Sequence, residues 1–433
     1  MKTCFRTNNL DIKLFDKFLP PPPSMPLQDL PCLQTSMLSE SRRINKRKSR
    51  SSLTEGLDTE CTPSDLIQQW SPSHKHQRLI SMGKENDQNQ FVLARRSRRK
   101  KGISWDHLPE ELLLRILFYL PLQDLLRMSR VCKRWNRLAF DESLWHSVDL
   151  EGLTHMGVAL QQVLNIGVCR LRCPRSFVEE TNFTVTGALQ IVELDLSSSI
   201  IPTSALESII SRCTQLEYLS LEGLQLSDAI ISSLSKNTNL LQLNLSGCSG
   251  FSAPPLADML KSCSRIERLN ISWCDFSNDH VKSVVENLSS AVTQLNVSGY
   301  RESFTLDDVT VLVTRCPHIT TLDLSDSTLL MADSFPILKQ LKNLRHLSLS
   351  RCYHIHLAAL TDLEQMFPLL SLLEVFGLLH DSQLSSLKKE LPRISVNTRP
   401  FSSIARPTPA CRPQGPVRDR AMWSRTCRLR VKL

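Results

Sequence analysis

Apolar residues return at a regular spacing between residues 148 and 398, in a unit that reads apolar-x-x-apolar-x-apolar. Three of these units are Leu216-x-x-Leu219-x-Leu221, Leu240-x-x-Leu243-x-Leu245 and Leu344-x-x-Leu347-x-Leu349. Successive central residues are 21 to 27 positions apart, and they are Val148, Leu171, Leu194, Leu219, Leu243, Leu269, Leu295, Leu322, Leu347, Leu373 and Ile394. A period of this length, kept over about ten units, predicts a solenoid of stacked repeats.

Each unit is expected to contribute one short strand and one helix. Apolar and polar residues alternate at the strand, so the polar residue between the last two apolar positions should face the open side of the sheet. These polar residues are Asp195, Ser220, Asn244, Asn270, Asn296, Asp323 and Ser348. The connecting segments have helical spacing, for example at Val281, Val284, Val285 and Leu288. We therefore predict an α/β horseshoe of leucine-rich repeats, with a parallel sheet on the concave side and helices on the convex side.

Cysteines recur in register with these units. Three of them lie three residues before a unit and three lie three residues after its last apolar position: Cys213, Cys263, Cys316, Cys248, Cys274 and Cys352. Because no histidine or acid recurs with them, we interpret them as small, reduced, buried packing residues rather than nucleophiles. The chain has 14 cysteines but no C-x-x-C pair, so zinc-site spacing is absent and no metal or cofactor is predicted.

A different pattern occupies residues 102–147. A helix is expected to begin with Pro109 in its first turn and to end at Pro121, and Asp124 is expected to cap the next helix. Residues 131–139 complete the set as a third helix. Three short helices cannot bury so many large apolar side chains among themselves. The surplus indicates a partner, or contact with the rest of the chain.

The two ends of the chain differ from its body in charge. Residues 1–101 carry 19 Lys+Arg and 10 Asp+Glu, residues 399–433 carry 9 and 1, and the body between them carries 24 and 32. Residues 1–101 lack sustained periodicity, which predicts a disordered basic tail, and its basic runs at 42–50 and 95–101 indicate either nuclear import or solvated charge. Residues 399–433 are predicted to form a basic C-terminal tail. An acidic body argues against a nucleic-acid-binding face, and no apolar stretch reaches the roughly 20 residues of a membrane span.

One position of the repeats departs from its own pattern. Two residues after the last apolar position, several units have glycine, as at Gly223, Gly247 and Gly299. In other units the same position holds Trp273, Asp326 and Arg351, and Tyr300, Arg301 and Tyr353 lie one or two residues further on. Stacked strands lie about 4.8 Å apart, so these side chains should line one rim over about 15 Å. Aromatic residues and arginine are typical of binding surfaces, so the rim is predicted to bind a partner, the alternative being a row of solvated turns.

The helical segment resembles the F-box. Leu108-Pro109-Glu110-Glu111-Leu112 opens the motif, and Val131-Cys132-Lys133-Arg134-Trp135 with Leu144-Trp145 closes it. F-box proteins are non-catalytic substrate receptors of SCF ubiquitin ligases, and the motif binds a small adaptor subunit that is joined to cullin and RING subunits. The resemblance implies that the adaptor would contact Trp105, Leu108, Pro109, Leu112, Ile116, Leu120, Val131 and Trp135.

The repeats resemble one branch of the F-box/leucine-rich repeat family in more detail. The similar segments are residues 221–224, 243–251, 294–301, 347–353 and 404–408. Members of this branch recruit phosphorylated cell-cycle regulators, such as a cyclin-dependent kinase inhibitor, for ubiquitination and proteasomal degradation. A small phosphate-binding cyclin-kinase subunit is their co-receptor.

The same resemblance implies roles for the rim and for the tails. Trp273, Arg301 and Asp326, together with Tyr300, would contact the co-receptor. The substrate would contact Arg351, Tyr353 and Phe401. The C-terminal tail would fold back along the concave face, the N-terminal tail would contact cyclin–kinase complexes, and the protein would be found in the nucleus and the cytoplasm.

Two other functions compete with the ligase receptor. A leucine-rich repeat protein can bind or inhibit an enzyme without any ligase, but the three-helix segment argues against this alternative. A nucleic-acid binder would act through the basic tails, against which the acidic body argues. No Gly-rich phosphate loop, metal cluster or acid–base pair in the sequence indicates a catalyst.

Overall fold

The computed structural model describes residues 105–154, 156–179, 187–407 and 429–430. The predicted disordered tail at 1–101 and its two basic runs lie outside these described residues. Within them, a helical segment is followed by a repeat array, and one continuous cluster of buried apolar side chains runs through both.

The helical segment is built from three short helices between two 3-10 turns. Its elements are η2 (Trp105–His107), α3 (Glu110–Leu117), α4 (Leu122–Met128), α5 (Lys133–Ala139) and η3 (Glu142–Leu144). Pro109 is the N-cap of α3 rather than part of its first turn, and Pro121 is the N-cap of α4. Proline suits these positions because the first N–H groups of a helix have no partner within it. The prediction that Asp124 caps α4 is therefore wrong: Asp124 lies inside the helix and pairs with Arg127 at 2.9 Å.

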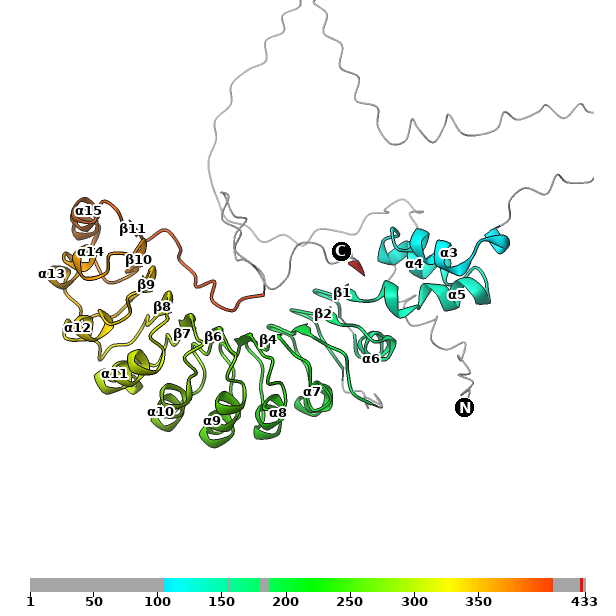
Figure 1. Ribbon diagram of the computed structural model, residues 1–433, viewed down its shortest axis with the longest axis horizontal. Helices are drawn as coiled ribbons and strands as arrows, with labels where there is room; N and C mark the ends of the chain where they lie inside the picture. The colour runs from blue at the N-terminus through cyan, green and yellow to red at the C-terminus, as the bar shows by residue number, and fades with distance from the viewer. Residues whose placement is uncertain (1–104, 155, 180–186, 408–428, 431–433) are drawn as a thin grey trace, which may run out of the picture. The chain divides into compact units, whose positions relative to one another are not determined.

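Every repeat adds one strand to a single parallel sheet (Figure 1). The strands are β1 (Ser147–Asp149), β2 (Arg170–Arg172), β3 (Glu193–Asp195), β4 (Tyr218–Ser220), β5 (Gln242–Asn244), β6 (Arg268–Asn270), β7 (Gln294–Asn296), β8 (Thr321–Asp323), β9 (His346–Ser348), β10 (Leu372–Glu374), β11 (Ser395–Val396) and β12 (Leu429–Arg430). They follow chain order from β1 to β11, and β12, from the end of the chain, pairs with β1.

Helices cover the convex side of the sheet (Figure 1). They are α6 (Gly157–Ile166), α7 (Thr203–Ile210), α8 (Asp228–Leu234), α9 (Ala253–Ser262), α10 (Asn278–Asn287), α11 (Leu306–Arg315), α12 (Ser334–Leu338), α13 (Leu357–Leu360), α14 (Leu363–Met366) and α15 (Asp381–Glu390), with a 3-10 turn η4 (Arg301–Ser303) after β7. The apolar face predicted at Val281, Val284 and Val285 is the buried face of α10. The α/β fold of leucine-rich repeats that the sequence predicts is confirmed.

The central apolar residues pair across the sheet in the predicted register, with one exception. Leu243, for example, lies between Leu219 and Leu269. In the last repeat, however, Leu373 pairs with Val396 and not with Ile394. Both candidates are buried, so the apolar pattern could not decide which of them belongs to the strand.

In five repeats the polar residue before the last apolar position ends the strand in a turn. Asn244, Asn270 and Asn296 each accept, at Oδ1, a hydrogen bond of 3.0 to 3.1 Å from the backbone N–H two residues later. Asp195 and Asp323 accept the same bond at 3.0 Å. These side chains replace a backbone acceptor in the turn, so they are buried in structure rather than open to solvent.

The recurring cysteines are packing residues, as predicted. The thiols of Cys248 and Cys274 each donate, at 3.0 Å, to a carbonyl oxygen of the preceding repeat, on Leu221 and Leu245 respectively. Burial raises the pKa of Cys274 to about 12. A thiol that stays protonated is a poor nucleophile, which removes the catalytic alternative for this residue.

Trp145 joins the helical segment to the array. Its side chain is fully buried, its ring stacks on Phe140 with centroids 5.7 Å apart, and its Nε1 donates to the carbonyl oxygen of Ala139 at 2.8 Å. Strand β1 begins two residues later, at Ser147. The first strand of the sheet is therefore anchored directly to the helices.

Candidate interaction sites on the helical segment and on the repeat rim

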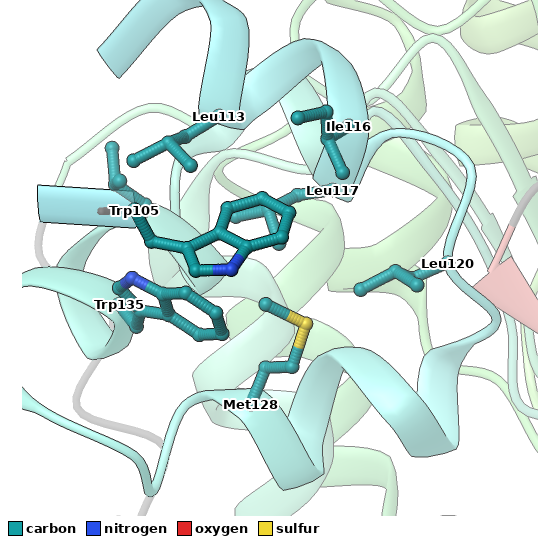
Figure 2. A pocket seen from close by; sticks show the side chains of 8 residues that line it. Trp105, Leu113, Ile116, Leu117, Leu120, Met128 and Trp135 are labelled. Carbon is teal, nitrogen blue, oxygen red and sulfur yellow. The ribbon is translucent and has the colours of Figure 1, made fainter. Parts of the chain in front are cut away.

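An apolar pocket of about 240 Å³ opens on the helical segment (Figure 2). It is lined by Trp105, Leu113, Ile116, Leu117, Leu120, Met128, Trp135 and Leu138. The indole rings of Trp105 and Trp135 meet edge to face, with centroids 5.9 Å apart, which is a favourable geometry for aromatic pairs. A pocket with only apolar and aromatic lining suits an apolar group of a partner.

The residues predicted to contact an adaptor surround this pocket with different degrees of exposure. Trp105, Pro109, Leu112, Ile116 and Val131 are exposed, and Leu108, Leu120 and Trp135 are half-buried. Leu112 and Ile116, one turn apart on α3, leave 48% and 42% of their surface exposed. Phe118 and Tyr119, after the same helix, are also exposed, although the sequence analysis did not select them. Tyr119 follows Leu112 by seven residues, two helical turns, and this spacing is the signal that could have found it.

Polar contacts fix the elements from which the two tryptophans reach the pocket. The guanidinium of Arg134 on α5 donates to the carbonyl oxygen of Leu108 at 2.6 Å. Its Nε lies 3.6 Å from the carboxylate of Glu110 on α3, which also pairs with Arg137. These bonds tie η2, α3 and α5 together, so the geometry seen in Figure 2 is held from outside the pocket.

The second candidate site lies where the chain leaves each strand. Two residues after the last apolar position, φ is positive in all ten repeats from β1 to β10, at Gly152, Arg175, Ser198, Gly223, Gly247, Trp273, Gly299, Asp326, Arg351 and Gly377. Glycine adopts this conformation without steric cost, whereas a side chain costs roughly 1–2 kcal/mol. Trp273, with φ +58°, is therefore strained. Because Arg175 and Ser198, in repeats away from Trp273, adopt the same conformation, the positive φ belongs to the repeat turn and does not by itself indicate a binding surface.

The rim side chains meet each other across four repeats. Trp273 lies over Gly299, since a Cβ built on Gly299 would be 2.7 Å from the indole. The guanidinium of Arg351 lies 5.2 Å from the centroid of the Trp273 ring, a cation–π contact. Arg351 and Arg301 each place Nε 3.4 Å from the carboxylate of Asp326. We call Trp273, Arg301, Asp326 and Arg351 the rim cluster.

Asp326 supports the rim cluster from below rather than at its surface. Only 4% of its surface is exposed, so the expectation of a direct contact between Asp326 and a partner does not fit its position. Its carboxylate lies between Arg301 and Arg351, whose side chains remain largely exposed. Two guanidinium groups around one carboxylate leave a net positive charge, which favours an acidic partner.

Tyr300 does not lie on the rim surface, contrary to prediction. Its ring is buried and stacks on Phe276 with centroids 5.3 Å apart, and its hydroxyl donates to the carbonyl oxygen of Ile271. The reason is its register, because Tyr300 comes three residues after Val297, which is the position that cysteine occupies in other repeats. That register was the signal that could have placed Tyr300 in the interior.

The last two predicted contact residues, Tyr353 and Phe401, are exposed. Phe401 belongs to a segment, residues 399–407, that contacts the concave face of the sheet. There, Nδ2 of Asn270 on β6 donates to the carbonyl oxygen of Ile404 at 3.1 Å. A second contact at the concave face holds the start of the segment, at the end of β10.

Glu374 of β10 makes this second contact, and it predicts a pH dependence of folding stability. Its Oε1 accepts from the backbone N–H of Arg399 at 2.9 Å, whereas its Oε2 is buried without a hydrogen-bond partner among the described residues. Burial raises the pKa of Glu374 from 4.5 to about 7. Because the folded pKa is the higher one, the protonated carboxyl stabilises the fold, and this contribution is lost as the pH rises from 4.5 through 7.

We expect Glu374→Gln to remove this pH dependence. At pH 8 the variant should exceed the parent in free energy of unfolding by up to about 3 kcal/mol, and below pH 4.5 the two should agree. Denaturant unfolding at several pH values measures the difference, with the exposed Glu302→Gln as the control. Parallel pH profiles for Glu374→Gln and the parent would contradict the assignment.

Gly299→Ala is expected to displace Trp273 without changing any side chain of the rim cluster. A Cβ at Gly299 would be 2.7 Å from the indole, whereas a Cβ at Gly223 would meet nothing closer than 3.8 Å. Both residues have positive φ, +95° and +74°, so either alanine should cost the fold about 1 kcal/mol. Only Gly299→Ala should lower the affinity for the partner that binds the rim, by about tenfold or more. Equal affinities of the two variants for the co-receptor would show that the position of the indole is unimportant.

Neither a metal-binding cluster nor a membrane-spanning helix occurs among the described residues. Among them, no group of three or more His, Cys, Asp or Glu side chains could hold a metal ion. In the same part of the chain, no helix combines the length and apolar character that crossing a bilayer requires.

Two protein families match the two parts of this architecture. The family described as "F-box-like" matches residues 105–151, and the family described as "SKP2 LRR domain" matches residues 158–430. The second match covers more than half of the chain. The chain therefore belongs to the family of F-box proteins with leucine-rich repeats.

Curated proteins and solved structures are similar to the chain. F-box/LRR-repeat protein 12 of Homo sapiens is 56% identical over 43 residues, which are 10% of this chain and 13% of that protein. F-box protein SKIP19 of Arabidopsis thaliana is 24% identical over 259 residues, 59% of this chain and 72% of that protein. The structure of a Rad7 and Elc1 complex in yeast covers 60% of this chain and 65% of the solved chain, with a TM-score of 0.38 and 14% identity. The chain thus spans only a small part of the length of the first of these relatives.

Proposed function

We propose that this protein is the non-catalytic substrate receptor of an SCF ubiquitin ligase. The observation that carries the proposal is the apolar surface of the F-box, where Leu112 and Ile116 stand exposed beside the pocket of Figure 2. Such a surface requires a partner that removes it from water, and the F-box is the motif that binds the SCF adaptor. A leucine-rich repeat protein that bound or inhibited an enzyme without a ligase would not need it.

The finer identity that we propose is a protein similar to S-phase kinase-associated protein 2. Support comes from the resemblance of residues 243–251, 294–301 and 347–353, and from the repeat family that matches residues 158–430. In this proposal the substrates are phosphorylated cell-cycle regulators, such as a cyclin-dependent kinase inhibitor. A small phosphate-binding cyclin-kinase subunit acts as co-receptor.

The rim cluster is the proposed contact with both of these partners. Trp273 and Arg301 would bind the co-receptor, and Arg351 would bind an acidic side chain of the substrate by a charge-assisted hydrogen bond. Tyr353 and Phe401 would add apolar contacts to the substrate. The supporting observations are the contact of Arg351 with the ring of Trp273 and the excess positive charge around Asp326.

Reconstitution with purified partners tests both levels of the proposal. The full chain should co-purify with an SCF adaptor, and the assembled ligase should ubiquitinate a phosphorylated inhibitor only when the co-receptor is present. Failure to recover the adaptor would remove the ligase proposal. Recovery of the adaptor without modification of the inhibitor would remove only the cell-cycle proposal.

We further propose that the protein acts in the nucleus and the cytoplasm, and that its N-terminal tail contacts cyclin–kinase complexes. Support comes from the basic runs at 42–50 and 95–101, which are typical of import signals. A fluorescent fusion of the full chain should leave the nucleus when both runs are replaced by Gly/Ser. An unchanged distribution would assign the runs to solvated charge.

A further inference from the structure

The two ends of the described chain meet at one edge of the sheet. Strand β1 would be an edge strand, but β12, from the end of the chain, lies parallel beside it (Figure 1). In this pairing Val148 lies opposite Leu429, and Asp149 lies opposite Arg430. An edge strand exposes a row of backbone N–H and C=O groups that readily accepts another extended segment. The β1 edge is therefore a strand-addition site with its occupant in place.

This site requires an apolar residue at one position. Leu429 is 0% exposed, and it extends the column of central residues in which Val148 pairs with Leu171. Leu429 of the last strand thus becomes a further buried residue of the apolar core of the array. A charged residue in register with Val148 would be forced into the apolar interior at a high desolvation cost.

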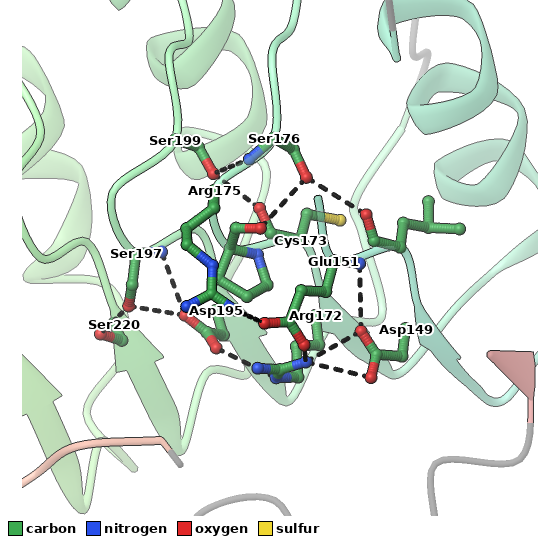
Figure 3. Close-up of polar contacts among 12 residues, drawn as sticks. Asp149, Glu151, Arg172, Cys173, Arg175, Ser176, Asp195, Ser197, Ser199 and Ser220 are labelled. Atoms are coloured by element: carbon green, nitrogen blue, oxygen red, sulfur yellow. Dashed lines mark hydrogen bonds and ion pairs between the residues drawn. The ribbon is translucent and has the colours of Figure 1, made fainter. Parts of the chain in front are cut away.

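The next position of the site is acidic (Figure 3). Both carboxylate oxygens of Asp149 accept hydrogen bonds of 3.1 Å from Arg172. Arg172 also pairs with Glu151, and its Nε lies 3.5 Å from Asp195. A further arginine, Arg175, pairs with Glu151. Three carboxylates and two guanidinium groups leave one negative charge, so a basic residue in register with Asp149 is favoured.

The C-terminal segment has a sequence that matches both requirements. Residues 425–433 read Arg-Thr-Cys-Arg-Leu-Arg-Val-Lys-Leu, with four basic residues, no acid, and basic and apolar residues in alternation from Arg428 onward. Leu429 and Arg430 hold the apolar and the acidic register positions. The repeat family match ends at residue 430, within β12, and the F-box-like match ends at residue 151, just after β1. The pairing of β12 with β1 therefore brings the ends of the two matched regions together.

We propose that the β1 edge is a binding site for an extended segment of alternating basic and apolar residues, and that the C-terminal strand occupies this site in cis. While the strand is in place, β1 is closed to other extended segments. A competing segment that displaces the strand would itself pair with β1, which begins two residues after Trp145, where the helical segment joins the array.

A peptide-capture experiment on the full chain tests the proposal. The variant exchanges two neighbours, Leu429→Arg with Arg430→Leu, so that composition and charge stay constant while the apolar and the basic residue change register positions. The probe is a fluorescein-labelled peptide of residues 425–433 with serine for cysteine, and binding is followed by anisotropy. The variant should bind the peptide at least about tenfold more tightly than the parent chain, because its own strand no longer fits the site.

Matched controls separate strand addition from simple charge attraction. A peptide that carries the same exchange should bind neither chain, although its composition is identical. Adding Asp149→Asn to the exchanged chain should lower its affinity for the peptide about three- to tenfold, because the acidic residue at this register position is lost. Equal affinity of the parent and exchanged chains, or equal affinity of the two peptides, would overturn the proposal.

Hydrogen exchange offers a second readout that does not depend on the peptide. In the exchanged chain, and in the milder Leu429→Ala variant, the backbone amides of Ser147 and Asp149, which point away from β2, should lose protection. The amide of Leu150, which donates to Arg172 on β2, and those of β5 and β6 should keep theirs. Protection at the β5 and β6 amides confirms that the array is folded. Unchanged protection at Ser147 and Asp149 in both variants would show that β12 does not close this edge.

Discussion

A chain with Leu112→Asp and Trp135→Ala is expected to lose the SCF adaptor completely, while the repeat array keeps its thermal unfolding midpoint. Leu112 is 48% exposed beside the pocket, and Trp135 forms one wall of it. An aspartate would have to be desolvated in an apolar contact, at a cost of several kcal/mol, and about 4 kcal/mol corresponds to roughly a thousandfold in affinity.

Two further variants show where this effect originates. Leu112→Asp alone changes an exposed side chain and should already reduce adaptor binding strongly without disturbing the helices. Val158→Asp makes the same kind of change at an exposed apolar residue of α6, outside the F-box, and it should leave adaptor binding unchanged. Calorimetry with the purified adaptor measures all three, and normal affinity in the double variant would exclude this face as the contact.

Trp273→Gly is expected to lower the affinity for the co-receptor by about 30-fold or more without destabilising the fold. Removal of an interface tryptophan commonly costs about 2 kcal/mol or more of binding free energy. At the same time, glycine relieves a backbone strain of roughly 1–2 kcal/mol at a position with φ +58°. Relief of the strain offsets the loss of the packing between the indole and Gly299. The free energy of unfolding should therefore change by less than about 1 kcal/mol.

The matched control for Trp273→Gly is Ser198→Gly. Ser198 occupies the same register position, with φ +55°, in a repeat outside the rim cluster, so its replacement should leave the co-receptor affinity unchanged. Titrations of the co-receptor and thermal unfolding of both variants are the measurements. An affinity loss that is equal in the two variants would mean that the turn backbone, and not the indole, is responsible.

Arg351→Ala extends this prediction to the substrate. With the co-receptor present, Arg351→Ala should lower the affinity for a phosphorylated inhibitor peptide by roughly 10- to 150-fold. This is the loss expected when one hydrogen bond to a charged group is removed. Because Arg351 lies 5.2 Å from the centroid of the Trp273 ring, the two substitutions should not be additive in the peptide titration. Additive effects in the double variant would show that the two side chains bind independently.

The sequence alone determined the repeat architecture of this protein. An apolar residue that returns every 21 to 27 positions can be buried only if the units stack, and this fixed the parallel sheet, the convex helices and the register of every strand up to β10. The same local information marked the surplus apolar residues of the helical segment and the cysteines of the interior. These features follow from the pattern of neighbours within one unit, which the chain displays directly.

Tertiary structure alone decided how the rim is built. Trp273 and Arg351 lie in the turns after strands β6 and β9, and their side chains touch because they extend across the intervening repeats. Asp326 is placed beneath two arginines, and Tyr300 points into the core with its hydroxyl on a neighbouring repeat. A linear pattern gives the position of each residue along the array but not the direction in which a long side chain extends, because that direction depends on backbone φ and on the neighbours' size.

The closure of the sheet edge shows the same division most clearly. The alternation of basic and apolar residues around Leu429 is visible in the sequence, but nothing local to it names a partner. The pairing with β1 joins residues about 280 positions apart, and contacts at such separation are set by the completed fold, because an edge must first exist before a strand can add to it. The sequence determined what each unit can bury, and the assembled array decided which distant segments share a surface.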